Sequence, residues 1–198
     1  GPSTDTLKLG VANDRNSEIR PGLNAEFWDA GVAFTEWCNA QGGIQGVPLE
    51  PVDIDGGVVN VEAAMIKACT EVFAMVGGGF AMDDLEFSGK EGSDFHKCGL
   101  IDIPGFTVSV DKSLSNGQVQ PVPNPANAKS TQWIIDFKKL YPEESKKTVV
   151  VYSKDLPSLE AVKVQFDAVV EAEGGIENLD PVTYGLVVTD WGPYAEKI

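Results

Sequence analysis

Residues 75–84 read Met-Val-Gly-Gly-Gly-Phe-Ala-Met-Asp-Asp, and this stretch decides the fold. Apolar residues 72–76 lead into three consecutive glycines, which predicts a buried strand followed by a sharp turn. Glycine lets a ligand approach main-chain N–H groups, and a helix beginning near Met82 or Asp83 would aim its dipole at the same place. The stretch therefore indicates a main-chain receptor for a small anion such as a carboxylate. Three glycines in a row also fit a plain tight turn.

The segments on either side of this turn alternate between strand-like and helix-like patterns. Strands are expected over residues 7–12, 49–54, 72–76, 148–152 and 181–186, and over 100–110 with a break at Pro104-Gly105. Helices are expected over residues 21–40, 61–73, a stretch from Met82 or Asp83 to near His96, 126–141, 158–173 and 190–198. Such alternation predicts an α/β fold, with parallel sheets covered by helices on both faces and joined by right-handed crossovers.

The composition changes at residues 113–125, where three prolines and a polar lead-in mark an extended connector. We therefore expect an N-terminal lobe over residues 1–118, a hinge or crossover over 119–125 and a partial C-terminal lobe over 126–198. The second unit has only two predicted strands, which make a poorly protected sheet. The chain is therefore expected to be a truncated form of a larger protein.

Charge and hydropathy exclude several kinds of partner. The 198 residues carry a formal charge of −15, which argues against binding to nucleic acid or to anionic lipid. No apolar run approaches the length needed to span a bilayer. No secretory signal is visible, and residues 1–4 fit a trimmed start, so the sequence does not indicate a compartment directly.

The residues for metal binding or catalysis are sparse. Three cysteines without CxxC spacing and a single His96 argue against a structural zinc site. Cys38 fits a buried thiol, whereas Cys69 and Cys98, on separate predicted helices flanking the glycine turn, could form a disulfide in an exported protein. The GGGF sequence matches neither a dinucleotide-binding nor a Walker A loop, and no GxSxG motif occurs. No catalytic residue, metal or cofactor is predicted.

Six short motifs in a fixed order carry a resemblance to a known family. They are LKLGVA at 7–12, NAQGGIQG at 39–46, LEPVDID at 49–55, FAMVG at 73–77, IPGFT at 103–107 and TDWGPY at 189–194. Their ordered combination resembles the type I periplasmic binding proteins, in the branched-chain amino acid group of ABC-transporter substrate-binding proteins. The resemblance covers nearly the whole chain.

This resemblance implies two parallel-sheet, Rossmann-like lobes with a small molecule bound in the cleft between them. It implies a non-enzymatic protein of the periplasm or cell surface that binds a carboxylate-bearing solute, such as an amino acid, and delivers it to a membrane ABC permease. Members are about twice this length, so the missing C-terminal half is a possible separate partner chain. The alternative on the same fold is the ligand-sensing domain of a receptor or of an amide-responsive regulator.

Carried over by position, the resemblance also implies a set of ligand contacts. They are Asn13, Gly79, Phe80, Ala81, Phe106, Thr107, Tyr152 and Leu156. The main chain of residues 79–81 would meet a ligand carboxylate, and the Thr107 hydroxyl would donate to it. Amino-acid binders usually carry small hydroxyl residues at 80–82 and an aromatic at 156–157, so the departures in this chain favour a ligand other than a branched-chain amino acid.

Several of these residues also have a structural interpretation. Phe106 fits core packing as well as it fits a cleft wall, Thr107 fits a turn cap, and Asn13 fits a strand-end turn. Trp28 and Trp37 lie on the apolar stripe of the first predicted helix, where core packing is expected rather than ligand binding.

Overall fold

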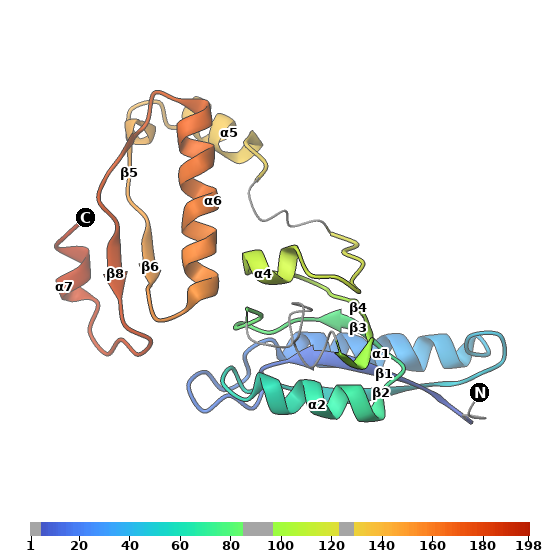
Figure 1. Ribbon diagram of the computed structural model, residues 1–198. Coiled ribbons are helices and arrows are strands. Elements are labelled where there is room, and N and C mark those ends of the chain that lie inside the picture. Colours follow the sequence, from blue (N-terminus) through green and yellow to red (C-terminus); the bar gives the residue numbers. More distant parts are fainter. Residues whose placement is uncertain (1–4, 85–96, 123–128) are drawn as a thin grey trace.

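The computed structural model describes residues 5–84, 97–122 and 129–198, and its elements form two lobes (Figure 1). The elements from β1 to α4 build the first lobe, and those from α5 to α7 build the second. The predicted helix from Met82 or Asp83 to near His96 lies largely outside the described residues, although residues 81–84 form a turn.

The first lobe is built on a four-stranded parallel sheet in the order β2-β1-β3-β4. Its strands are β1 (Leu7–Asn13), β2 (Leu49–Asp55), β3 (Ala74–Gly78) and β4 (Ile101–Ile103). The predicted parallel α/β sheet is therefore confirmed. Because the strands are parallel, all four carboxyl ends meet at one edge, and the loops that follow them gather there.

Helices α1 (Ala25–Ala40) and α2 (Val61–Glu71) cover opposite faces of this sheet. Side chains alternate along β1, so Val11 faces α1, where a Cβ on Gly31 would lie 2.6 Å from Val11 Cγ2. Gly10 faces the other way, toward Met75 and Ile54. The main core lies on the α2 face and includes Ala12, Val52, Ile54, Val61, Ala64, Met65, Ala68, Met75, Phe80 and Leu100.

Helix α1 differs from the prediction in its start and in its buried face. It begins at Ala25 rather than at 21, because Gly22 (φ +83°) and Asn24 (φ +58°) are left-handed and cannot continue a right-handed helix. The predicted core position of Trp37 is wrong, since its side chain is 61% exposed. Gly31 faces the sheet instead and allows a close approach, and the small residue Thr35 is the buried position of this helix.

The second lobe packs α5 (Gln132–Leu140) on α6 (Pro157–Glu173) around Ile134, Val169 and Val170. Its parallel strand pairs are β5 (Lys147–Thr148) with β7 (Glu177–Asn178), and β6 (Val151–Ser153) with β8 (Val182–Tyr184). The short helices of the two lobes are α4 (Val110–Ser113), η1 (Glu144–Lys146) and α7 (Gly192–Ala195).

The two strands predicted for the second lobe are each shorter than expected. Residues 148–152 divide between β5 and β6, and β8 is preceded by a separate strand, β7, that the sequence did not indicate. Pro181 stands between β7 and β8 and has no N–H group to donate to the ladder, which accounts for the interruption.

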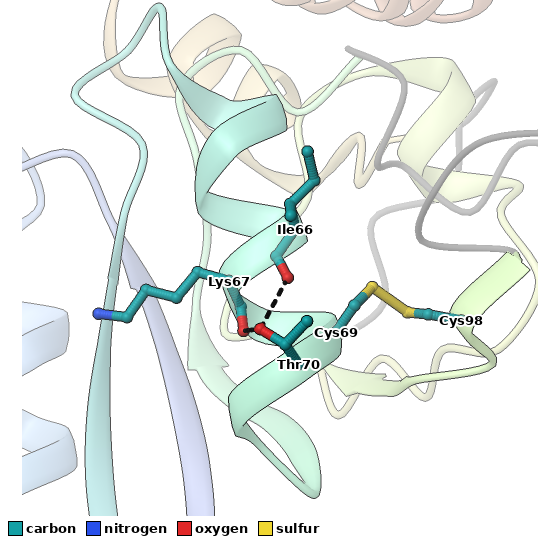
Figure 2. The surroundings of a disulfide bond; sticks show 5 residues. All are labelled: Ile66, Lys67, Cys69, Thr70 and Cys98. Atoms are coloured by element: carbon teal, nitrogen blue, oxygen red, sulfur yellow. Dashed lines mark hydrogen bonds between the residues drawn. A yellow bond between two sulfur atoms is a disulfide. The ribbon is translucent and has the colours of Figure 1, made fainter.

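A disulfide joins Cys69 of α2 to Cys98, which shortly precedes β4 (Figure 2). The two Cα atoms lie 5.8 Å apart, within the normal range for a disulfide. The predicted pairing is therefore present, whereas Cys38 is free and half-buried rather than buried.

No helix in the described ranges combines the length and the apolar character that a membrane span requires. Across the same ranges, His, Cys, Asp and Glu side chains form no group of three or more that could hold a metal ion.

The glycine stretch provides a matched test of the sheet geometry. Gly77 (φ +74°) and Gly78 (φ +76°) both end β3 in left-handed conformations. A Cβ on Gly78 would lie 2.0 Å from the Ala12 carbonyl oxygen, whereas a Cβ on Gly77 would meet nothing within 4 Å. We predict that Gly77→Ala lowers the free energy of unfolding by about 1–2 kcal/mol, the cost of the left-handed backbone. Gly78→Ala must also displace β1, and should cost roughly 3 kcal/mol or more. Urea unfolding measures both, and equal losses would contradict this packing.

Candidate functional site: the cleft between the lobes

A cleft of about 410 Å³ lies between the two lobes. Its first wall is formed by Ile19, Arg20, Leu23, Val58 and Ala81. Its second wall is formed by Leu156, Tyr184, Leu186, Val187, Val188 and Trp191. This volume falls within the range of small-molecule sites, which is about 300–1,000 Å³.

The first wall comes from loops that follow the carboxyl ends of β1, β2 and β3. The second wall comes from the loop after β6, from Tyr184 at the end of β8 and from the segment between β8 and α7. Loops at the carboxyl edge of parallel strands are the usual ligand-binding positions of open α/β sheets. The topology therefore brings together residues that are far apart in the sequence.

The cleft walls are mainly apolar and contain two aromatic rings. Val187 is 73% exposed and Trp191 is 52% exposed, although both are large apolar residues. The rings of Tyr184 and Trp191 meet edge to face, with centroids 5.0 Å apart. Apolar surface concentrated in this way is typical of binding sites. Among the lining residues, Arg20 carries the one formal charge.

The buried carboxylate of Asp14 holds the first wall together. Its Oδ2 accepts a hydrogen bond from the Ala81 N–H at 2.7 Å, and its Oδ1 accepts one from the Val58 N–H at 2.8 Å. The Asn24 side-chain amide lies 3.5 Å from Oδ2. Asp14 thus joins the loop after β1 to the β2–α2 loop and to the glycine turn.

Burial raises the pKa of Asp14 above its ordinary value of 3.8, while the hydrogen bonds from Ala81 and Val58 lower it and the nearby Asp55 charge raises it. Burial is the largest of these effects, because a carboxylate loses its hydration when it leaves water.

A second buried carboxylate, that of Asp83, holds the other side of the glycine turn. Its Oδ2 accepts from the Val108 N–H at 2.7 Å, and its Oδ1 accepts from the Ser109 N–H at 2.9 Å. Burial raises the pKa of Asp83 as well, against the lowering effect of these hydrogen bonds. The turn is therefore attached to the segment after β4, and a buried ion pair joins Lys112 of that segment to Asp102 of β4.

The lobes meet directly at the glycine turn. Ser158, in the first turn of α6, is almost fully buried, and its hydroxyl donates to the Ala81 carbonyl at 2.7 Å. Ala81 therefore uses its N–H within the first lobe and its carbonyl across the lobes.

Two of the predicted ligand residues, Ala81 and Leu156, line the cleft from opposite lobes. Phe80 lies beside them in the sequence, but its ring packs in the core of the first lobe. The Gly79 N–H donates to the Ala12 carbonyl at 3.1 Å, within the first lobe. The structure therefore brings Ala81 and Leu156 to one site and directs the Phe80 ring away from it.

The side chain of Asn13 is fully buried and bonded within the protein. Its Nδ2 donates to Asp53 Oδ1 at 2.7 Å, and its Oδ1 accepts from the Arg15 N–H. These contacts fit the alternative of a strand-end turn. The ligand role of Asn13 stays a prediction.

The remaining predicted residues lie outside the cleft lining. Phe106 stacks on Phe27 of α1 with ring centroids 5.4 Å apart. Thr107 is buried and donates to Gln120 Oε1 at 3.4 Å. Tyr152 lines a separate recess of the second lobe, beside Phe166. The ligand roles of these three residues also stay predictions.

Sequence reasoning missed most of the cleft residues, above all Arg20 and Trp191. Ile19 and Leu23 interrupt an otherwise polar loop with apolar side chains, which was a usable signal. The apolar run at 186–188 continues past the end of β8, where a strand facing the core would normally stop. Nothing in the pattern connects Arg20 with residues 160 or more positions away.

The first prediction from the site concerns the stability of the Asp14 loop junction. Asp14→Ala leaves the buried Val58 N–H and the half-buried Ala81 N–H without acceptors, and a buried unsatisfied group costs about 1–3 kcal/mol. We expect a loss of roughly 2–5 kcal/mol in urea unfolding. The control is Asp29→Ala, which removes an equal charge from an exposed position of α1. A similar loss in both variants would show that Asp14 has no special structural role.

The raised pKa of Asp14 predicts the pH dependence of its contribution. A raised pKa means that the folded state binds the proton more tightly than the unfolded chain does. Its stabilising effect is therefore largest below the ordinary pKa of 3.8 and decreases as the pH rises through the folded-state pKa. The difference in unfolding free energy between wild type and Asp14→Ala should shrink as the pH rises from the ordinary pKa of 3.8 through the higher folded-state pKa. A difference that grows over this range would contradict the raised pKa.

No protein-family model matches the sequence, and no curated protein matches it. Solved structures do match. The branched-chain amino acid substrate-binding protein LivJ from Streptococcus pneumoniae, in complex with isoleucine, is 18% identical with a TM-score of 0.70, over 98% of this chain and 53% of that one. A fatty acid ABC transporter substrate-binding protein from Thermomonospora curvata is 19% identical with a TM-score of 0.69, over 97% and 48% of the two chains.

A third match is an ABC-transporter solute-binding protein from Rhodopseudomonas palustris BisB5 in complex with 3,4-dihydroxybenzoic acid. It is 15% identical with a TM-score of 0.66, over 98% of this chain and 51% of that one. The chain thus spans about half the length of the solved structures it matches. With its parallel sheet and its cleft between two lobes, the chain has the fold of the type I periplasmic solute-binding proteins of ABC transporters.

Proposed function

We propose that this chain belongs to an extracytoplasmic substrate-binding protein that holds a small carboxylate-bearing solute between its lobes and delivers it to a membrane ABC permease. The observation that carries the proposal is the cleft itself, because its walls come from both lobes and expose apolar and aromatic side chains. The disulfide supports a location outside the cytoplasm. Matching structures bind isoleucine and dihydroxybenzoic acid, which are both small carboxylate-bearing molecules.

The proposed mechanism is a shift of population toward the closed form. A solute that touches Ala81 of the first lobe and Leu156 of the second makes both contacts only when the lobes are together. The Ser158–Ala81 hydrogen bond links the lobes at the same point, so it favours the same arrangement. The permease would then distinguish the closed form from the open one.

This function predicts binding that depends on the cleft tryptophan. In a thermal-shift screen of amino acids, aromatic acids and fatty acids, a true ligand should raise stability by about 2.7 kcal/mol at a concentration a hundredfold above its Kd. Trp191→Ala removes an aromatic wall and should weaken binding about tenfold or more. Titration calorimetry measures the affinity directly.

The matched control is Trp37→Ala. Trp37 is exposed to a similar degree but lies on α1, outside the cleft lining. Binding by this variant should equal that of the wild type. Equal effects of the two substitutions, or the absence of stabilisation by every solute in the screen, would refute the proposed function.

A further inference from the structure

We propose that Arg20 is the anion-binding residue of the cleft, and that the solute is an apolar, aromatic monocarboxylic acid whose carboxylate pairs with the Arg20 guanidinium. This inference rests on the proposed function and identifies the ligand class. It also moves the carboxylate away from the main chain of the glycine turn, where the sequence pattern predicts it.

Two main-chain donors of the glycine turn, the N–H groups of Gly79 and Ala81, are used within the protein. The Gly79 N–H donates to the Ala12 carbonyl, and the Ala81 N–H donates to the Asp14 carboxylate. The Asp14 carboxylate thus already accepts the hydrogen bond that the Ala81 N–H would have to donate to a ligand anion. A second carboxylate next to it would meet like-charge repulsion in a buried setting.

Arg20 is an exposed residue of the cleft lining and is held in place by its main chain. Its N–H donates to Ser17 Oγ at 3.2 Å, and its carbonyl accepts from the Leu23 N–H at 3.1 Å. Arg20 lines the cleft, and its guanidinium forms no ion pair with any residue in the described ranges. The chain's other arginine, Arg15, pairs with Asp53 at 2.5 Å and lies over the Trp28 ring. Arg20 therefore has its charge available for a ligand.

The planar fork of a guanidinium matches the two oxygens of a carboxylate, and such bidentate pairs are among the stronger hydrogen bonds. Arg20 is the cation among the lining residues that this part of the chain supplies, and it fits an acidic group. Opposite Arg20, the edge-to-face pair of Tyr184 and Trp191 provides aromatic surface for the body of the ligand. The combination favours an acid with an aromatic ring over a polar or dianionic solute.

Two probes of nearly equal shape test the charge requirement: 3-phenylpropanoate, and 3-phenylpropanamide, which is neutral. Titration calorimetry on the whole chain should show the acid binding about tenfold to a hundredfold more tightly than the amide. Arg20→Gln should reduce the affinity for the acid by a similar factor and leave the affinity for the amide unchanged. Because Arg20 is exposed, this variant should melt at the wild-type temperature.

The control is Lys8→Gln, which removes an equal charge near the opposite end of β1. It should bind the acid as the wild type does, so that a general change in protein charge is excluded. If Arg20→Gln and Lys8→Gln bind the acid equally, Arg20 is not the anion site. If the wild type binds other solutes of the screen but neither probe, the assigned ligand class is wrong. In both cases Trp191-dependent solute binding, and with it the proposed function, would still stand.

Discussion

The structure of the cleft depends on one buried carboxylate. Asp14 accepts hydrogen bonds from the main chain of Val58 and Ala81, so three loops that share no sequence neighbourhood are held at one point. Val58 has a left-handed φ of +73°, which costs a β-branched residue at least about 1–2 kcal/mol. Its hydrogen bond to Asp14 offsets part of that cost and keeps its side chain in the cleft wall. Burial of the charge is unfavourable, and the two N–H groups make it tolerable.

The glycine turn transmits this constraint to the second lobe. Asp14 and Asp83 fix the turn from its two sides, and the Ala81 carbonyl between them accepts the hydroxyl of Ser158. A rigid acceptor in the first lobe gives the partner helix a defined docking position. Any solute that contacts Ala81 therefore lies beside the hydrogen bond that joins the lobes. Under the proposed function, ligand contact and lobe contact would be coupled through this one residue.

The sequence predicted the local pattern well and the long-range contacts poorly. The alternation of strands and helices identified the parallel sheet, and the glycine run located the loop that forms the cleft wall. The buried face of α1 could not be predicted from its apolar stripe, because Gly31 packs on the sheet and Thr35 is buried, whereas Trp37 is exposed. In the sequence, Asp14 looks like an ordinary turn-forming residue. Its structural role could not be predicted, because it depends on an N–H donor that is 67 positions away. Arg20 and Trp191 meet only through the arrangement of the two lobes.

The Cys69–Cys98 bond has a consequence for the loop at the centre of the cleft. The 29-residue separation that it closes contains β3, the glycine turn and Asp83, so this wall segment forms a covalent ring anchored on α2. In the chain-entropy account, such a ring lowers the conformational entropy of the unfolded chain. The folded state is thereby stabilised by about 3–4 kcal/mol. The glycine turn, which contacts the second lobe through Ala81, therefore stays covalently tethered to α2 even when the sheet around it opens. Reduction of this single bond would release it.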